Sequence, residues 1–254
     1  MKIKIQDFLK TRIFCIFLNM DILKELWKFN DIFFEEESHI YTNSLNTNFK
    51  SCTAFVDEFC PKPDWDAILK RKSEKTGEAT EVIKARWDAA GEYARTLGTE
   101  IHSVMENIWK HKNYPGNIAK MKEYDGMIKD FYERKETCIK LYNKMKNIWE
   151  PIVNEFIVYD VDNCITGTVD FLAYNKKTEK IDLIDWKTSK EFKQENRWEK
   201  MLKPFDKFDD CNINHYSLQL SLYKYIIEKK TNLKIDKMIL FQIPAIAYSP
   251  MSCE

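Results

Sequence analysis

Residues 167–189 read GTVDFLAYNKKTEKIDLIDWKTS. This stretch contains two runs rich in β-branched and aromatic residues, joined by the turn-forming sequence NKKTEK, so it predicts two adjacent strands. Side chains alternate between the two faces of a strand, and every second residue from Ile181 to Lys187 therefore shares one face. The aliphatic members of that face are predicted core, whereas Asp185 and Lys187 are expected to emerge where it meets solvent.

A lone acid, Asp170, lies within the first of these runs, shortly after Gly167. If the two strands pair antiparallel, Asp170 and Asp185 approach each other, and such carboxylates repel unless a proton or a divalent cation lies between them. Magnesium and manganese prefer oxygen ligands of this kind. Lys187, about 7 Å along the strand from Asp185, can orient or deprotonate a water molecule. The set suits metal-assisted phosphodiester hydrolysis, although Asp-x-Lys alone is also typical of surface ion pairs.

Before these strands the sequence is almost entirely helical from residue 52 to residue 150. Asp64 is expected to cap one helix that Gly77 ends. The longest amphipathic stretch extends from residue 118 to residue 149, and Pro151 is expected to close it.

After this helical part the apolar pattern becomes strand-like. Residues 155–162 form a third run, which makes a meander with the two strands quoted above. Residues 212–230 predict an amphipathic helix and residues 234–244 a final strand. This order implies a crossover that adds the last strand in parallel beside the meander. The prediction is an α/β fold with a mixed central sheet flanked by helices and a helical N-terminal layer.

The length of 254 residues suits one sizeable core. We predict a helical appendage at 1–30 and a single domain at 31–254, with the helical layer at 51–150 and the sheet core at 151–254. The basic and then apolar start of the chain is interrupted early by polar residues, which favours an amphipathic helix over a signal peptide.

Composition predicts an intracellular protein of the cytoplasm or nucleus. Acidic and basic residues balance at 40 each, so any nucleic-acid site has to be a local cluster. The seven cysteines are odd in number and form no C-x-x-C pair, which favours a reducing environment. No apolar stretch approaches the roughly 20 residues of a membrane span.

Residues 167–189 resemble the core of the PD-(D/E)XK nuclease superfamily, with Asp170 and Asp185 as its acids and Lys187 as its lysine. The segment GTEIHSVMEN at 98–107 is similar to the upstream histidine motif of the RecB-like exonuclease branch, through His102.

Two further segments carry the same resemblance. QLSLY matches the Q-x-x-x-Y motif of the RecB-like branch through Gln219 and Tyr223, and SCTAFVDEF at 51–59 looks like the opening of phage and large-virus exonucleases. The resemblance implies a restriction-endonuclease-like core that binds one or two magnesium or manganese ions. The implied metal ligands are His102, Asp170, Asp185 and the backbone carbonyl of Trp186.

Several implied roles have plainer alternatives. His102 is otherwise an ordinary helix polar residue, and Glu106, one turn later, supports it or a second metal or is simply solvated. Gln219 and Tyr223 would face the active site and the nucleic-acid backbone, although Tyr223 also suits a packed core. Thr188 and Ser189 can donate to a phosphate, as strand-end hydroxyls often do. Exposed aromatic side chains could stack on bases, but the pattern singles out none.

The resemblance implies a metal-dependent DNA exonuclease of DNA processing, recombination or repair, acting on single-stranded DNA or duplex ends. A structure-specific endonuclease on the same fold and a catalytically silent DNA-binding scaffold are the alternatives. No nucleotide-binding G-x-x-x-x-G-K-[ST] segment occurs, and the cysteine spacing of an iron–sulfur cluster is missing, so neither cofactor is expected. No membrane is expected as a partner, and no helicase, polymerase or recombination partner can be named.

Overall fold

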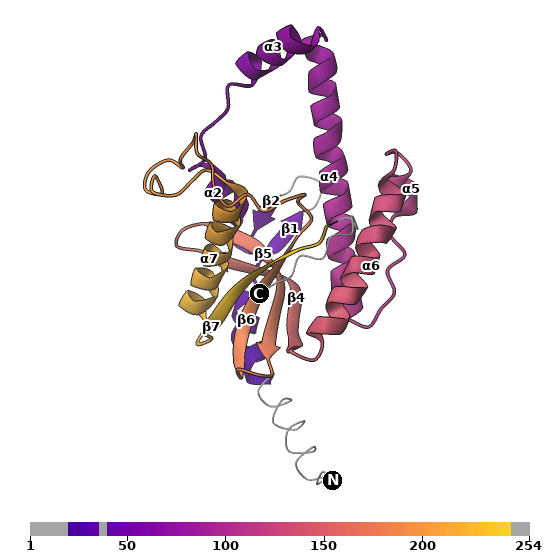
Figure 1. The fold of residues 1–254 in the computed structure, drawn as a ribbon. Helices are drawn as coiled ribbons and strands as arrows, with labels where there is room; N and C mark the ends of the chain where they lie inside the picture. Colours follow the sequence, from indigo (N-terminus) through magenta and orange to yellow (C-terminus); the bar gives the residue numbers. More distant parts are fainter. Residues whose placement is uncertain (1–19, 36–39, 245–254) are drawn as a thin grey trace. The chain divides into compact units, whose positions relative to one another are not determined.

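The computed structural model describes residues 20–35 and 40–244, which form two compact units (Figure 1). The first unit comprises the described residues up to Asp57, Asn147–Asp185 and His215–Ile239. The second comprises Glu58–Lys146, Trp186–Asn214 and the described residues from Leu240. Strands β6 and β7 and helix α7 each begin in one unit and end in the other.

The sheet of the first unit has the order β1-β2-β3-β5-β6-β7, with β4 paired to β5. Its strands are β1 (Phe33–Glu35), β2 (Ile40–Thr42), β3 (Asn48–Ser51), β4 (Trp149–Asp160), β5 (Ile165–Asn175), β6 (Lys180–Lys187) and β7 (Ile235–Gln242). Strands β4, β5 and β6 form the predicted antiparallel meander. Mixed strand directions in a sheet flanked by helices confirm the predicted restriction-endonuclease-like fold class.

Strand β7 lies beside β6 in the predicted parallel direction. Near one end of the pair, Lys180 Nζ donates to Asp236 Oδ1 over 2.8 Å. Near the other end, the amide of Ile243 donates to the carbonyl of Lys187, also over 2.8 Å. Both pairs have the same separation in sequence, which only a parallel arrangement allows.

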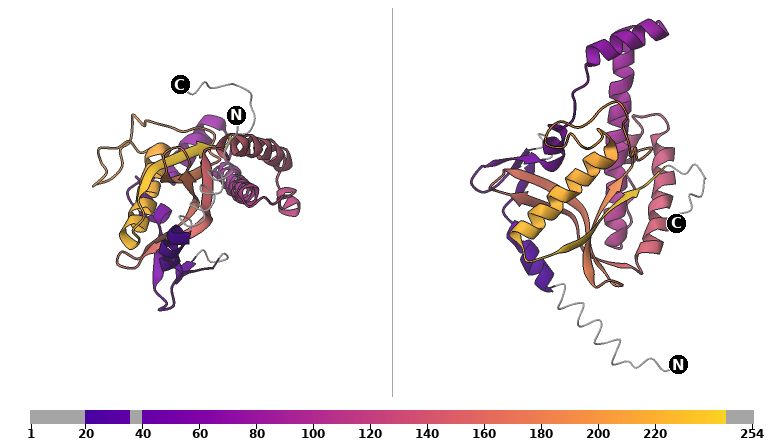
Figure 2. Two further views of the ribbon diagram at one scale, coloured as in Figure 1. Left: turned by 90° about the horizontal axis from the view of Figure 1, so that it is seen from below. Right: turned by 60° about the vertical axis from the view of Figure 1, so that its left-hand side comes forward.

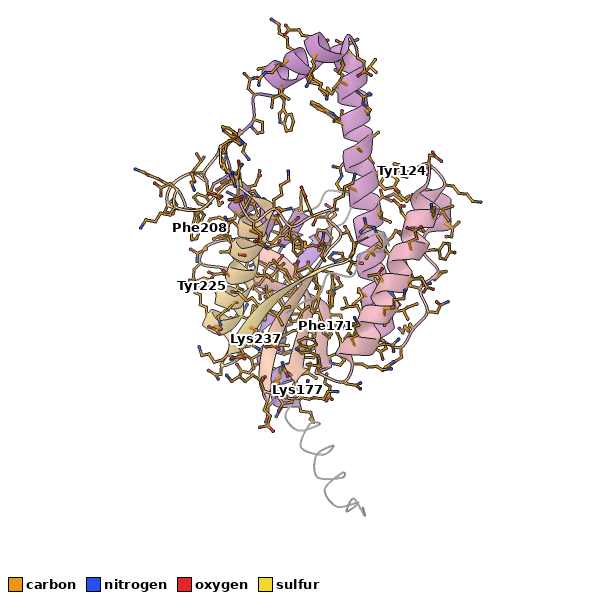
Figure 3. The ribbon with its side chains drawn as sticks, viewed as in Figure 1. Tyr124, Phe171, Lys177, Phe208, Tyr225 and Lys237 are labelled. Atoms are coloured by element: carbon orange, nitrogen blue, oxygen red, sulfur yellow. The ribbon has the colours of Figure 1, made fainter. Side chains whose placement is uncertain are left out.

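Strand β5 is the centre of the sheet because it pairs with three other strands, β3, β4 and β6. One edge pairs with β4 along nearly its whole length. The other edge pairs in parallel with β3 at Ile165 and Thr166, and then antiparallel with β6 from Phe171 onward. Phe171 is fully buried among these strands, whereas Lys177 lies in the turn between β5 and β6 (Figure 3).

Helix α7 (Asn212–Lys230) lies along the strands of the first unit, as the right-hand view of Figure 2 shows. Its buried side chains are Leu220, Tyr223, Ile226 and Ile227. Gly167 of β5 allows Tyr223 to come close, because a Cβ atom at Gly167 would lie 2.3 Å from Tyr223 Cε1. The lack of a side chain at Gly167 therefore determines how closely α7 packs.

Gly167→Ala is expected to destabilise the protein by about 1–3 kcal/mol, because the buried Tyr223 ring has to move to admit a methyl group. Gly98→Ala is the matched control, since its Cβ would meet only Thr188 Oγ1, at an ordinary 3.5 Å. In a helix this change should be neutral or stabilising by up to about 1 kcal/mol. Urea unfolding measures both, and equal stabilities of the two variants would contradict the packing argument.

The first unit also contains the short helix α2 (Cys52–Asp57) and residues 20–29. Ser51 Oγ accepts a hydrogen bond from the amide of Ala54 over 3.1 Å, so Ser51 caps α2. Residues 20–26 are helical, with Ile22 and Leu26 buried. Residues 1–19 of the predicted appendage lie outside the described residues, and the predicted domain boundaries stay predictions.

The second unit contains α3 (Trp65–Thr76), α4 (Thr80–Trp109), α5 (Ile118–Met121) and α6 (Met127–Met145), and α6 packs along α4 (Figure 1). The predicted ends of α3 are confirmed: Asp64 accepts from the amide of Ala67 over 3.0 Å, and Gly77 ends the helix with φ 72°. In the described part of the chain no helix is long and apolar enough to cross a membrane.

The prediction of one long amphipathic helix over 118–149 is wrong. Gly126, with φ 75°, separates α5 from α6 because glycine readily adopts this left-handed conformation. Strand β4 already begins at Trp149, so Pro151 lies inside a strand rather than closing a helix. The register shifts between Pro151 and Val153, as expected where proline cannot donate to the sheet.

Candidate active site

Two carboxylates meet on neighbouring strands of the first unit. Asn154 pairs with Phe171 and Phe156 with Val169, so Glu155 of β4 lies opposite Asp170 of β5. Carboxylate oxygens of Glu155 and Asp170 lie within 4.8 Å of one another. Glu155 was not among the predicted site residues, because its importance depends on a register that the strand pattern does not reveal.

The backbone at Glu155 is strained, with a φ of 47° in the left-handed region. For a residue with a side chain inside a strand, this conformation costs about 1–3 kcal/mol and persists only where surrounding structure imposes it. Such strain clusters at functional sites. The strained backbone at Glu155 therefore supports a functional role for its carboxylate, which lies beside Asp170.

Asp185 of β6 extends the acidic group to a third strand. Phe171 pairs with Ile184 at the end of this antiparallel register, and Asp170 and Asp185 are the next residues along the two strands. Asp170 is 8% exposed and Asp185 is 1% exposed. The expected emergence of Asp185 into solvent is therefore wrong, because the face of β6 that carries it stays packed up to Asp185: Leu183, on the same face, is fully buried as well.

Three acids from adjacent strands are costly in a sheet interior unless a cation or protons compensate for their charge. Carboxylate oxygens are the ligands that magnesium and manganese prefer. The acidic group, in which Asp170 and Asp185 are buried and Glu155 is half-buried, therefore fits a divalent metal ion. Which residues act as ligands stays a prediction.

Strand β6 continues from Asp185 to Lys187, the last residue of the strand. Lys187 is half-buried, and its position two residues after Asp185 puts the two side chains on the same face of the strand. Trp186 points to the opposite face, where its ring packs against Phe241 with centroids 5.6 Å apart. Tryptophan packing thus anchors the strand end that presents Lys187.

The predicted Gln219–Tyr223 pair lies on α7 in the first unit. Gln219 Nε2 donates to Tyr223 Oη over 2.7 Å. Burial raises the pKa of Tyr223 well above its usual value, and the nearby Cys52 thiol and the charges of Asp185 and Asp170 raise it further. Tyr223 is thus both a core residue and a neutral hydroxyl within electrostatic range of the two acids.

A cavity of about 440 Å³ opens beside this tyrosine. Tyr223, Gly167 and Thr168 line it together with Ser51 and Thr53 of the SCTAFVDEF segment. Residues 51–57 of that segment therefore lie in the same unit as Asp170 and beside the same strand. Burial raises the pKa of Cys52 to about 12, so its thiol stays protonated at neutral pH.

Helix α4 of the second unit carries His102 and Glu106. His102 is half-buried and lies one turn after Gly98, which approaches the side chain of Thr188. Glu106 forms an ion pair with Lys110 on the helix surface, in keeping with the alternative of a solvated acid. A metal-binding role for His102 and a supporting role for Glu106 stay predictions.

Thr188 and Ser189 follow β6 in the second unit, and both are half-buried. Arg134 Nη1 donates to the carbonyl of Thr188 over 3.2 Å, which holds this segment against α6. Arg134 is a residue that the strand and helix patterns do not single out. A role for either hydroxyl in phosphate binding stays a prediction.

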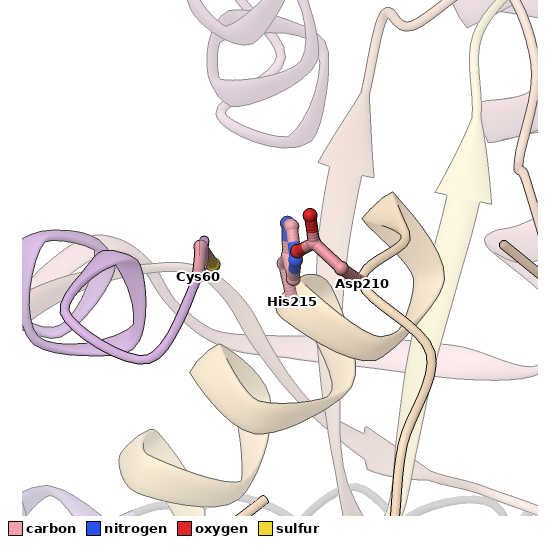
Figure 4. A group of neighbouring side chains, drawn as sticks. All are labelled: Cys60, Asp210 and His215. Carbon is pink, nitrogen blue, oxygen red and sulfur yellow. The ribbon is translucent and has the colours of Figure 1, made fainter. Parts of the chain in front are cut away.

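Another group of potential ligands, which the sequence motifs do not include, lies near the start of α7. In the second unit, a thiol and a carboxylate, those of Cys60 and Asp210, lie within 4.8 Å of one another (Figure 4). His215 is on the first turn of the helix that follows Asp210. This group is separate in sequence from the motifs described above.

Comparison with known proteins supports one family. The family model of the PD-(D/E)XK nuclease superfamily matches residues 78–249, and no curated protein shows a significant sequence match to the chain. The matched range is more than half of the chain and includes all three acids, Lys187 and the strands of the meander. On these grounds the chain belongs to the PD-(D/E)XK nuclease superfamily.

Proposed function

We propose that the protein is a metal-dependent DNA exonuclease of the RecB-like branch, acting in DNA processing, recombination or repair. Membership of the superfamily implies a nuclease that hydrolyses DNA and uses magnesium or manganese. The observation that carries the proposal is the acidic group of Glu155, Asp170 and Asp185 on adjacent strands, followed on β6 by Lys187. The RecB-like assignment and the likeness to viral members rest on the histidine, Q-x-x-x-Y and SCTAFVDEF motifs, and the choice of exonuclease over endonuclease rests on analogy with that branch.

Asp170, Asp185 and Glu155 would hold the cation, with His102 and the backbone carbonyl of Trp186 completing its ligands. When bound, magnesium or manganese neutralises the charge that develops on the phosphate and lowers the pKa of water. Lys187 would take up or hold a proton of the attacking water molecule, or stabilise the developing negative charge.

Neutral donors would position the DNA backbone. The Tyr223 hydroxyl keeps its proton, because burial raises its pKa, and can donate to a phosphate oxygen. Gln219 orients that hydroxyl through their mutual hydrogen bond. Thr188 and Ser189 would add donors on the segment that follows Lys187.

Digestion of end-labelled linear DNA and a matched closed circle tests this function. We expect loss of the linear DNA alone, with magnesium or manganese and not with EDTA. Cutting of the circle would establish the alternative endonuclease. Intact linear and circular DNA, together with DNA binding, would favour the silent scaffold.

Glu155→Gln is expected to reduce DNA cleavage about 10- to 100-fold and to raise the metal concentration needed for half-maximal rate. A neutral amide at this position removes one of the negative charges that would hold the cation. The metal titration of the cleavage rate measures both effects. Glu150→Gln on the same strand is the control and should leave the metal titration unchanged. If Glu155→Gln gave the same metal titration as the wild type, Glu155 would have no part in metal binding.

A further inference from the structure

A second cavity lies wholly within the second unit, beside the residues that follow β6. Its volume is about 640 Å³, which is typical of small-molecule sites. Three alanines of α4 and the residues Leu97, Tyr93, Tyr124 and Arg134 contribute to its walls. The lining thus combines small apolar side chains with aromatic and charged ones.

Two tyrosines form a rigid corner of this cavity. The rings of Tyr93 and Tyr124 meet edge to face at 89°, with centroids 6.1 Å apart. The Tyr93 hydroxyl donates to Asp130 Oδ2 over 2.6 Å, which fixes the ring. Tyr124 lies in the connection between α5 and α6 (Figure 3). An aromatic corner beside the alanines suits a flat ring, because such faces stack well.

Unused hydrogen-bond donors line the same cavity. Arg134 is 7% exposed, and its Nη1 donates to the carbonyls of Thr188 and Ile243. Within the described residues, Arg134 Nε and Ser189 Oγ are buried without a hydrogen-bond partner. Buried polar atoms are usually satisfied, so a small movement of either lining side chain would let these donors meet a ligand that accepts hydrogen bonds.

The charge of the lining argues against a phosphate as that ligand. Three carboxylates, those of Glu123, Asp125 and Asp130, face only two cations, Arg134 and Lys190. Negative lining repels an anion but can accept hydrogen bonds from the N–H groups of a neutral ring. A nucleobase offers a flat ring together with donors and acceptors on its edge.

The cavity also lies close to Lys187 along the chain. Ser189 follows Lys187 by two residues, roughly 7 Å of extended chain, which equals the rise of about two nucleotides in a duplex strand. Building on the proposed function, we propose that this cavity binds an unstacked nucleobase of the DNA strand end. The cavity would thereby hold the strand end in place for cleavage.

Ala94→Phe tests the proposal by filling the cavity, and Ala85→Phe is the matched control. Both alanines are exposed on α4, but only Ala94 lines the cavity. The fluorescent base 2-aminopurine replaces one base near the strand end, at a different position in each DNA of a series. Every protein in this binding experiment is the full chain and also carries Lys187→Ala, which slows digestion of the DNA. We expect quenching of the probe with the Ala85→Phe variant, and loss of quenching with about tenfold weaker binding for Ala94→Phe.

Cleavage by otherwise wild-type protein supplies a second measurement. The wild type and Ala85→Phe should cut DNA that has a normal terminal base faster than DNA that has an abasic analogue at that position. Ala94→Phe should cut these two DNA substrates at the same rate. Unchanged quenching in Ala94→Phe, or no preference of the wild type for the base, would overturn the proposal. If the wild type cuts neither DNA, the proposed function fails, while the fluorescence result still decides what the cavity binds.

Discussion

Asp185→Asn should nearly abolish metal-dependent DNA cleavage while stabilising the metal-free protein. Metal ions stabilise transition-state charge by several kcal/mol, so loss of a charged ligand should slow cleavage about a thousandfold. Asp185 is 1% exposed, and the buried Asp170 lies on the neighbouring strand, so the charge of Asp185 opposes folding when no cation is present. A neutral amide of the same shape removes this repulsion.

Cleavage rates and thermal unfolding in EDTA measure the two effects. We expect Tm in EDTA to rise by roughly 2–4 °C for each kcal/mol of repulsion removed. Gain of stability with loss of activity would show that the acid serves function at the expense of the fold. Full activity of Asp185→Asn, or a lower Tm in EDTA, would contradict the assignment.

Asp182→Asn is the matched control on the same strand. Asp182 is fully buried, but its Oδ2 accepts hydrogen bonds from Trp149 Nε1 and Asn175 Nδ2, each over 2.8 Å. An amide here weakens these bonds, so Asp182→Asn should lower stability by about 1–3 kcal/mol. The activity of each folded molecule should stay close to that of the wild type. The two acids of β6 should thus respond in opposite directions.

Lys187→Ala is expected to slow cleavage by about 10²–10⁴-fold, the usual contribution of a positioned acid–base group. DNA binding should change little, because one lysine supplies only part of the backbone attraction. Single-turnover cleavage measures the effect on the reaction, and the fluorescence anisotropy of labelled DNA without added metal measures the effect on binding.

Lys180→Ala is the control for Lys187, since Lys180 begins the same strand but forms an exposed ion pair with Asp236. Such surface pairs contribute about 0–1 kcal/mol, so cleavage should stay within about twofold of the wild type. Equal rates for the two variants would exclude a role for Lys187 in the reaction. A parallel loss of DNA binding in Lys187→Ala alone would instead make it a binding residue.

Local sequence patterns were sufficient for the elements whose boundaries depend on their own residues. The predicted bounds of α7 are confirmed, because turn-forming residues and a change of period mark its ends. The helix predicted over 118–149 failed for the opposite reason. Its amphipathic pattern gave no sign that Gly126 adopts a positive φ or that Trp149 already pairs with Asn175 in the sheet.

The sequence by itself determined the α/β fold class, the antiparallel pairing of β5 and β6, and the motif that contains Asp170, Asp185 and Lys187. Only the tertiary structure placed Glu155 opposite Asp170 and revealed the cavity beside Arg134 and Ser189. The physical reason is the range of the interactions. Alternation and turns are properties of neighbouring residues, whereas register, backbone strain and cavities arise when distant segments pack together.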